Sequence, residues 1–429
     1  MAKETTQKEH MNIIVVTTYQ LTNIRTRQSG VYQRLKMLLE AACEASNTVT
    51  LVSLGHTEKV RRLDEFEQVL ATELAVFWSV RVRVRCVLVN PDRISKFSWK
   101  YHLARIIRTR LFTRLESVHD LVTCDFHKVI HSLTDRQTVV IAHRLPAMSA
   151  VRRVLSSAVP IVFDLDDIEH ERQRQYLQFY SRFIDRLQVR LAQFTAWQEE
   201  KAAIRRAEAT LVCSWKDVDT LNFTFGKARP VYAPNSVHSP ITAAPPITAS
   251  DVLLMVANYN GFFNAEGARW FVREVWPRVL SYRPNAQLWF VGDNGGVICD
   301  YKTPPDNVRV FGFLEYLQSA YAGAQAVICP VRAGSGTRIK ILEAVTFDRP
   351  VVTTTIGVEG LEFNHNLHVL IGDTAESFAM HCVQLLANIT NCRQIALRAR
   401  REMRLLYDHD NVMDRLVKTM KTIRYERKI

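Results

Sequence analysis

The part of this chain best suited to chemistry is a short segment that contains two glycines, then two basic residues, then a carboxylate. They lie where the loop RAGSGT leads into the helical stretch RIKILEAVTF. Gly334 and Gly336 would let the backbone approach a phosphate closely. Arg338 and Lys340 stand at the expected helix start, where the dipole favours anions, so an anionic ligand would explain these cations. Glu343 lies one turn further on and could accept hydrogen bonds from ribose hydroxyls. The pattern predicts a cradle for a nucleoside diphosphate.

The elements around this cradle alternate between buried strands and helices, twice along the chain. The apolar run MNIIVVTTY opens the first alternation, and DVLLMVANY opens the second. Runs of this kind, separated by helical periodicity, are typical of parallel strands in doubly wound sheets. We therefore predict an α/β protein with two Rossmann-like domains. The predicted divisions are residues 1–238, a Pro- and Ala-rich linker at 239–249, residues 250–405, and a terminal helix at 406–429 that packs back on the first domain.

The composition supports two domains. A chain of 429 residues exceeds the size at which one core keeps growing, and 47% hydrophobic with 23% charged residues is typical of soluble globular proteins. The first ten residues lack the apolar core of a secretory signal, and no apolar run reaches the ~20 residues of a membrane helix. We expect a cytoplasmic protein. Eight scattered cysteines without a C-x-x-C pair predict free, mostly buried thiols.

The net charge of +13 is concentrated in the first half of the chain. Residues 1–240 carry 35 Lys and Arg against 25 Asp and Glu. Within this half, the stretch from Arg93 to Arg114 holds seven basic residues and no acidic one, interleaved with apolar residues. A basic amphipathic helix of this kind suits an anionic membrane surface, such as the inner membrane face, or an acidic partner. A solvated helix that covers the first sheet is the alternative, and no nucleic-acid recognition motif is present.

The cradle segment resembles the donor-binding motif of the family-four glycosyltransferases, also called glycosyl transferases group one. It resembles in particular the bacterial branch that builds surface polysaccharides. Further resemblances lie in VYAPNSV, VANYNGFFNAEGARWFVREVWPRV, VFGFLEYLQSAYAGAQAVICP, TTIGVEGL, FDLDDIEH, WQEE and VCSWKDVDTL. The second half of the chain matches best. The resemblance implies a GT-B fold, with two Rossmann-like domains facing across a cleft. It also implies retaining, metal-independent transfer of a sugar from a nucleotide-diphosphate sugar to a polysaccharide or lipid-linked acceptor, without a cofactor.

The resemblance also assigns roles in the second domain. Arg338 and Lys340 would stabilise the leaving diphosphate, and Glu343 would hold the ribose. The family has a pair of glutamates eight positions apart, but Ser335 occupies the first position here. The family's basic pair near the first donor-domain strand is also replaced, by Ala257-Asn258 and later Asn264. The predicted donor-binding residues are Gly334, Ser335, Gly336, Thr337, Arg338, Lys340, Glu343 and Asn258.

In the first domain, His143 ends the strand-like run TVVIAH. A histidine at a similar position in the family contacts the donor sugar near the reacting carbon, so His143 joins Arg338 and Lys340 in the predicted catalytic set. A hydrogen-bonded structural histidine is the alternative, and His170 is a rival for the same role. Ser29 and Gly30 could bring the start of the first helix toward the ligand, although a Ser-Gly pair is as often a turn.

The run IVFDLDD ends in closely spaced carboxylates, with Asp166 and Asp167 at its end and Glu169 next. Charges of one sign so close together repel unless something polar or basic binds them. We place Asp166, Asp167 and His170 on the acceptor or sugar side. A metal-binding D-x-D motif is the weaker interpretation, because the donor-binding features come some 170 residues later. No metal site is predicted.

Other functions of the same architecture remain open. A nucleotide-sugar epimerase would change the sugar without an acceptor. A sugar phosphorylase would need a pyridoxal-binding lysine, for which no distinctive motif is present. A non-catalytic scaffold that binds a sugar nucleotide is suggested by Ser335 in place of a glutamate.

Overall fold

The computed structural model describes residues 11–19, 21, 30–56, 63–88, 123–226, 228–237, 245–295 and 307–425. Ser29, the basic stretch 93–114, Cys299 and residues 239–244 of the predicted linker lie outside this range. The described chain forms two compact units. One comprises Met1–Ala233 with Met413–Ile429, and the other comprises Pro234–Val412.

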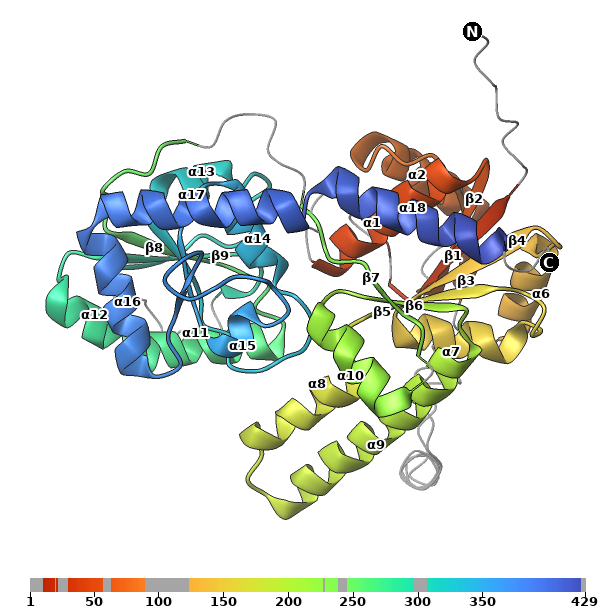
Figure 1. Cartoon of the computed structure of the whole chain (residues 1–429), viewed down its shortest axis with the longest axis horizontal. Coiled ribbons are helices and arrows are strands. Elements are labelled where there is room, and N and C mark those ends of the chain that lie inside the picture. The colour runs from red at the N-terminus through yellow and green to blue at the C-terminus, as the bar shows by residue number, and fades with distance from the viewer. Residues whose placement is uncertain are drawn as a thin grey trace, which may run out of the picture. The chain divides into compact units, whose positions relative to one another are not determined.

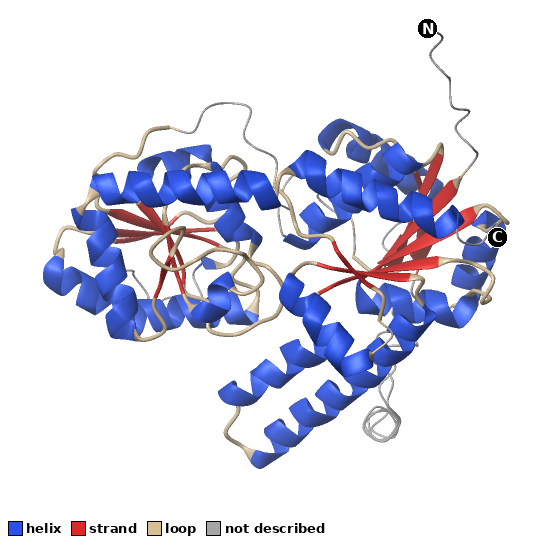
Figure 2. Ribbon diagram, in the orientation of Figure 1, coloured by secondary structure: helices blue, strands red, loops and turns tan. Residues whose placement is uncertain are grey.

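The first unit is built on a sheet of seven parallel strands in the order β3-β2-β1-β4-β5-β6-β7. The strands are β1 (Asn12–Thr17), β2 (Thr48–His56), β3 (Arg83–Leu88), β4 (Thr138–His143), β5 (Ile161–Asp166), β6 (Ala209–Val212) and β7 (Pro230–Tyr232). The central strands β4 and β5 are buried along their whole length, because helices cover both faces of the sheet (Figure 2). The continuous apolar runs of the sequence reflect this two-sided burial.

The helices of the first unit connect these strands in chain order. They are α1 (Gly30–Ala45), α2 (Leu63–Phe77), α6 (Cys124–Leu133), α7 (Arg144–Val154), α8 (Glu169–Tyr176), the short η1 (Leu177–Phe179), α9 (Phe183–Arg206) and α10 (Trp215–Phe225). Figure 1 shows α8 and α9 as a helical hairpin that projects from the rest of this unit.

The second unit contains six parallel strands in the order β10-β9-β8-β11-β12-β13. The strands are β8 (Val252–Val256), β9 (Gln287–Val291), β10 (Val308–Val310), β11 (Ala326–Cys329), β12 (Val351–Thr353) and β13 (Leu370–Ile371). Successive residues of β8 pack on opposite faces of the sheet, with Leu253 in one apolar cluster and Leu254 in another. The sheet therefore has a core on each face, as a doubly wound fold requires.

The helices of the second unit are α11 (Phe262–Trp270), the π-helical turn η2 (Phe271–Val275), α12 (Trp276–Tyr282), α13 (Gln318–Gly323), α14 (Ile339–Thr346), α15 (Thr355–Val358), α16 (Ala375–Ala387) and α17 (Ile389–Leu406). The last helix, α18 (His409–Tyr425), begins in this unit, and its residues from Met413 onward group with the first unit. There the Arg415 guanidinium lies 5.7 Å from the centre of the Tyr232 ring.

The predicted α/β class with two doubly wound sheets is confirmed. The prediction of mostly buried thiols holds for five of the seven described cysteines; Cys124 is exposed and Cys43 is half-buried. Among the helices of the described residues, none combines the length and apolarity needed to cross a membrane.

Candidate functional site

The cradle predicted from the sequence lies at the point where the strand order of the second sheet reverses. Strands β8 and β11 are neighbours at the centre, and the chain leaves them toward opposite edges. In doubly wound sheets, ligands bind in the crevice that the loops after two such strands leave between them. Gly267 of α11 lies so close to the loop after β11 that a Cβ there would be 2.3 Å from the Pro330 carbonyl oxygen. This glycine lets α11 pack directly against the loop after β11.

The loop after β11 is shaped by its own arginine. Gly334 and Gly336 have φ angles of 118° and 74°, in the region that favours glycine. The Arg338 guanidinium donates 2.7 Å hydrogen bonds to the carbonyl oxygens of both glycines and a further hydrogen bond to that of Ser335. Arg338 therefore holds the loop in its turned conformation, a role that its position in the sequence did not indicate.

Two polar atoms of this loop are buried without a hydrogen-bond partner among the described residues. They are the Ser335 hydroxyl and the Arg338 Nε–H. Buried polar groups are nearly always paired in folded proteins, so each exception calls for an explanation. A polar ligand in the loop would pair both groups.

Lys340, near the start of α14, is hydrogen-bonded to the start of α11. Its ammonium group donates a 2.6 Å hydrogen bond to Asn264 Oδ1, and the Asn264 amide nitrogen donates a 2.9 Å hydrogen bond to the Asn258 carbonyl oxygen. Burial lowers the pKa of Lys340 from its ordinary value. The structure thus brings the predicted residues Lys340 and Asn258 together through Asn264. In the sequence, Asn264 marked only a missing basic residue.

Glu343 lies behind the loop, on α14. The Tyr321 hydroxyl donates a 3.0 Å hydrogen bond to Glu343 Oε2, and the buried Tyr321 ring stacks on Phe347 with 4.4 Å between centroids. Burial raises the pKa of Glu343 to about 7, although the Tyr321 hydroxyl and Lys340 act in the opposite direction. The carboxyl group is therefore fixed at one oxygen and titrates close to neutral pH.

This raised pKa predicts a pH-dependent stability. Because the folded protein binds the Glu343 proton more tightly than the unfolded chain does, the stability that Glu343 contributes is fully present below the unfolded pKa. It is lost as pH rises through about 7. Between about pH 5 and pH 8, wild type should lose ~1–3 kcal/mol of unfolding free energy relative to the Glu343→Gln variant. Urea unfolding of both proteins at the two pH values measures this. A difference that does not change with pH would mean that the carboxyl group titrates normally.

The segment that enters the second unit also reaches the loop. The buried Asn235 donates a 2.8 Å hydrogen bond from Nδ2 to Thr337 Oγ1. Asn235 lies in VYAPNSV, one of the segments that carry the family resemblance. Thr337 is thus placed by a residue about 100 positions earlier in the chain.

In the first unit, His143 occupies the corresponding reversal point of the sheet. Strands β1 and β4 are neighbours there, and His143 at the end of β4 has its Nδ1 3.0 Å from Thr17 Oγ1. The Thr17 hydroxyl also accepts a 3.2 Å hydrogen bond from the Tyr19 N–H. Burial lowers the pKa of His143 to about 3, so the imidazole is neutral.

The free side of this imidazole faces Asp164. His143 Nε2 and Asp164 Oδ2 are 4.0 Å apart, and neither has a hydrogen-bond partner among the described residues. The other carboxylate oxygen, Oδ1, accepts hydrogen bonds of 3.0 Å and 2.6 Å from Nε and Nη2 of Arg34. Both charged side chains are fully buried. Arg34 was missed in the sequence, although an arginine within the apolar periodicity of VYQRLKMLLEAACEA was a signal for a buried ion pair.

A second arginine neutralises the other carboxylates of IVFDLDD. Arg144 Nη2 donates a 2.6 Å hydrogen bond to Asp167, and Arg144 Nε lies 3.6 Å from Asp166 Oδ2. Burial raises the pKa of Asp166, but Arg144 and Arg34 outweigh this and lower it overall. The basic group that these aspartates require therefore belongs to the chain itself. Among the described residues, no group of three His, Cys, Asp or Glu side chains is placed to hold a metal ion.

The backbone beside these residues is strained. Arg144 and Asp166 have φ angles of 69° and 58°, which non-glycine residues rarely adopt. Both lie at the carboxyl ends of central strands, where such strain is typical of functional sites. Arg144 Nη1 also donates a 2.6 Å hydrogen bond to the Tyr19 hydroxyl.

Two other predicted residues lie outside these networks. His170 is buried, with Nδ1 bonded to Glu200 and Nε2 3.6 Å from Glu171, so it fastens α8 to α9. Gly30 is the first residue of α1. Neither shares a hydrogen bond with His143 or the aspartates.

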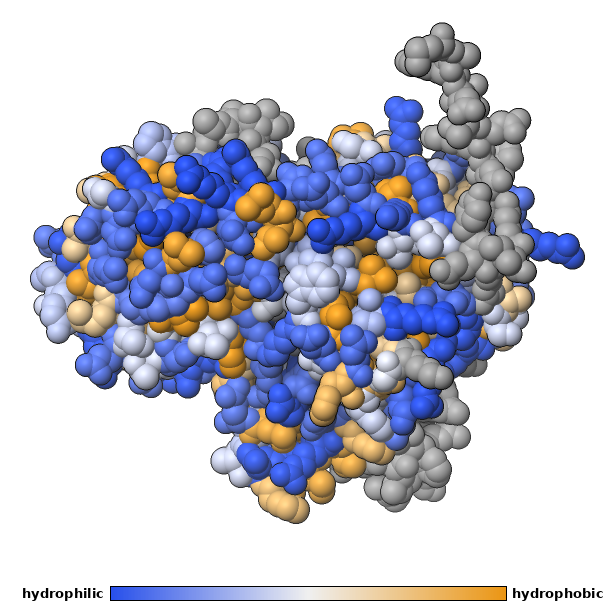
Figure 3. All heavy atoms as spheres, in the orientation of Figure 1, coloured by the Kyte–Doolittle hydropathy of each residue, from blue (hydrophilic) through white to orange (hydrophobic). Residues whose placement is uncertain are grey.

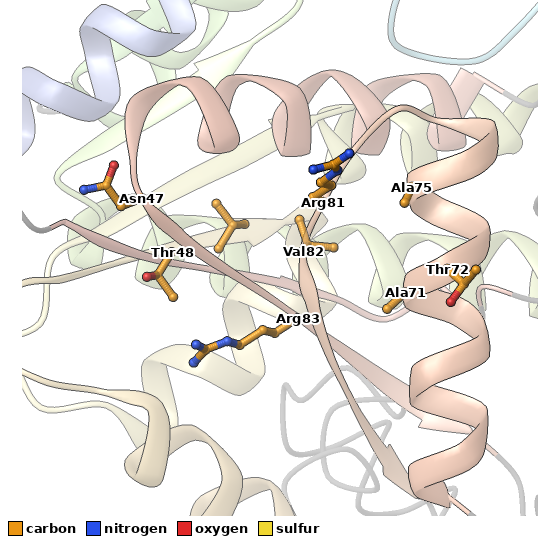
Figure 4. Close-up of a pocket in the computed structure, with 9 residues that line it drawn as sticks. Asn47, Thr48, Ala71, Thr72, Ala75, Arg81, Val82 and Arg83 are labelled. Atoms are coloured by element: carbon orange, nitrogen blue, oxygen red, sulfur yellow. The ribbon is translucent and has the colours of Figure 1, made fainter. Parts of the chain in front are cut away.

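A cavity of about 520 Å³ lies elsewhere in the first unit (Figure 4). Its lining comes from β2, β3 and α2, and comprises Asn47, Thr48, Val49, Ala71, Thr72, Ala75, Arg81, Val82 and Arg83. Thr48 and Arg83 are the first residues of their strands, so the cavity lies at the amino ends of the strands. Ligands of such sheets bind at the carboxyl ends, and we assign this cavity no function.

The second unit carries a family match. Residues 250–388 match the family model described as Glycosyl transferases group 1. An uncharacterized 44.6 kDa protein in the cps region of Klebsiella pneumoniae is 29% identical over 174 residues, which are 39% of this chain and 45% of that protein. The match thus spans less than half of the relative's length.

Several solved structures share the fold along almost the whole chain. Sucrose-phosphate synthase from Thermosynechococcus elongatus has a TM-score of 0.68 at 13% identity, with 96% of this chain and 99% of that chain covered. A mutant of S. aureus TarM, solved with fondaparinux, alpha-GlcNAc-glycerol and UDP, has a TM-score of 0.67 at 11% identity, with 95% and 99% covered. Anabaena HepE, solved with UDP and glucose, has a TM-score of 0.64 at 12% identity, with 96% and 100% covered. The chain therefore has the GT-B fold, and its residues 250–388 match the family model of the Glycosyl transferases group 1.

Proposed function

We propose that this protein transfers a sugar from a nucleotide-diphosphate sugar to a polysaccharide or lipid-linked acceptor, with retention of configuration and without a metal ion. One observation carries the proposal. At the reversal point of the second sheet, Lys340 of α14 is hydrogen-bonded to Asn264 of α11, which in turn is hydrogen-bonded to the loop after β8, and all three lie in the region that matches the glycosyltransferase family model.

The donor diphosphate would bind in this loop. The Lys340 ammonium supplies a positive charge where the leaving group gains negative charge, and fixed groups of this kind need no reorganisation during the reaction. The Ser335 hydroxyl, which has no partner within the described part of the chain, would donate a hydrogen bond to a phosphate or sugar oxygen. The carboxyl group of Glu343 would accept hydrogen bonds from the ribose. Arg338 would contribute through the loop conformation and through its Nε–H, to which no described residue is hydrogen-bonded.

His143 would act on the sugar as a neutral hydrogen-bond donor. In this role the ring proton would lie on Nε2, which has no hydrogen-bond partner among the described residues, and the low pKa excludes an imidazolium at neutral pH. In this proposal the leaving phosphate takes the proton of the acceptor hydroxyl, and no enzyme nucleophile is invoked. Asp166 and Asp167, paired with Arg144, would face sugar or acceptor hydroxyls.

The relatives suggest the substrates to try first. TarM and HepE were solved with UDP, so a uridine nucleotide is our first choice of donor. The Klebsiella pneumoniae relative from the cps region supports an acceptor in polysaccharide synthesis. We place the protein in the cytoplasm, where the stretch 93–114 would hold it at the membrane that carries a lipid-linked acceptor.

A panel of UDP-sugars tests the proposal. We expect one of them to be hydrolysed slowly to UDP and sugar, and to give a glycoside when a lipid extract or capsule fragment is added. Proton NMR of the first-formed product should show the anomeric configuration of the donor. The opposite anomer would overturn retention. A changed sugar still attached to UDP would identify an epimerase, and UDP-sugar binding without turnover would identify a scaffold, to which Ser335 already points.

A further inference from the structure

The hairpin of α8 and α9 is anchored at its base to the rest of the first unit. Glu199 of α9 accepts hydrogen bonds of 2.5 Å from Arg152 and 2.7 Å from Arg153, both on α7. The neighbouring Glu200 contacts His170 of α8. These contacts fix the second half of α9 against the first unit, while its first half extends beyond them (Figure 1).

The first half of α9 carries an exposed apolar stripe, defined as Phe183, Ile184, Leu187 and Phe194. Their side chains are 78%, 66%, 46% and 49% exposed. Phe183, Leu187 and Phe194 recur at helical spacing and share one face of the helix. The residues that α9 buries lie in its second half, roughly on the opposite face. In the space-filling view, orange and tan atoms gather at the end of this hairpin (Figure 3).

Basic side chains border the stripe. Arg182 and Arg190 are exposed, and Asp185 is the single acidic residue between positions 172 and 198. Arg186 donates hydrogen bonds to the carbonyl oxygens of Leu177 and Tyr180, which closes the hairpin turn. Apolar residues at a projecting tip, with arginines beside them, are typical of helices that lie in the headgroup region of an anionic bilayer.

We propose that the apolar stripe of the α8–α9 hairpin inserts into the headgroup region of an anionic phospholipid surface, with Arg182 and Arg190 on the lipid phosphates. A lipid surface accounts for both features of the tip, because the acyl boundary takes up the apolar side chains and the phosphates take up the positive charge. The inference rests on the first unit alone and does not depend on the proposed sugar transfer.

Sedimentation of the full chain with vesicles tests this site. Wild type should partition onto vesicles of phosphatidylglycerol and phosphatidylcholine, and much less onto phosphatidylcholine alone. The double variant Phe183→Ser and Leu187→Ser should weaken partitioning by about tenfold or more, because two exposed apolar groups no longer enter the bilayer. The matched control is Val69→Ser with Val76→Ser on α2, whose side chains are 57% and 65% exposed. This control should bind vesicles as wild type does.

A second double variant, Arg182→Glu with Arg190→Glu, tests the role of charge. It should weaken vesicle binding and reduce the dependence of that binding on salt. Thermal melts and UDP binding of all variants, expected to match wild type, separate this outcome from misfolding and from failure of the proposed function. Three results would overturn the proposal: no vesicle binding by wild type, unchanged binding by the double serine variant, or loss of binding only on Arg105→Glu with Arg108→Glu. Dimers that the double serine variant dissociates would show instead that the stripe is a protein interface.

Discussion

Replacing Lys340 by methionine should weaken UDP binding by roughly 30- to 100-fold, the loss expected when a charged hydrogen bond to a phosphate is removed. Lys340 of α14 is a basic side chain whose position is fixed by its hydrogen bond to Asn264 of α11. Arg338, by contrast, donates three hydrogen bonds to carbonyl oxygens of its own loop. Isothermal titration calorimetry with UDP measures the change in Kd.

Controls separate binding from folding. Burial lowers the pKa of Lys340, which means that the buried ammonium group destabilises the protein when no ligand is bound. The methionine variant should therefore melt no lower than wild type. Lys418→Met on the exposed face of α18 should leave UDP affinity unchanged. Equal UDP affinity of wild type and the Lys340→Met variant would remove Lys340 from the donor site and, with it, the observation that carries the proposed function.

Replacing Arg34 by methionine should lower the free energy of unfolding of the first unit by about 3–5 kcal/mol, the cost of leaving one partner of a buried ion pair unpaired. Asp164 would be left without its partner in a site from which water is excluded, since both side chains are fully buried. The Ala233 carbonyl oxygen would also lose its 2.6 Å hydrogen bond from Arg34 Nη1. Urea unfolding, followed by circular dichroism, measures the loss.

A second substitution makes this prediction sharper. Asp164→Leu in the Arg34→Met background should restore much of the stability, because an apolar pair costs no desolvation of charge. Arg174→Met, which breaks an exposed ion pair with Glu171, should cost less than about 1 kcal/mol. If Arg34→Met costs no more than Arg174→Met, the ion pair between Arg34 and Asp164 does not stabilise the first unit.

The sequence predicted the α/β fold and the glycine loop between β11 and α14 from short local patterns. The apolar runs that become β1 and β8 are buried on both faces, and that pattern is a local property of the chain. The loop from Gly334 to Gly336 was recognisable for the same reason, since its glycines and basic neighbours are adjacent in the sequence. The sequence did not assign Arg338 to its own loop, because the direction in which an arginine folds depends on the backbone carbonyls around it.

Sequence alone therefore determined two doubly wound sheets, a glycine loop before a basic helix, and a histidine at the end of a central strand. Tertiary structure decided which side chains meet. Arg34 pairs with Asp164 across 130 positions, and Lys340 reaches Asn264 across 76. The closely spaced carboxylates of IVFDLDD called for a basic partner, and Arg34 and Arg144 supply it from within the chain. The physical reason is that periodicity and loop chemistry act between near neighbours, whereas the partner of a buried charge is chosen by how the elements pack.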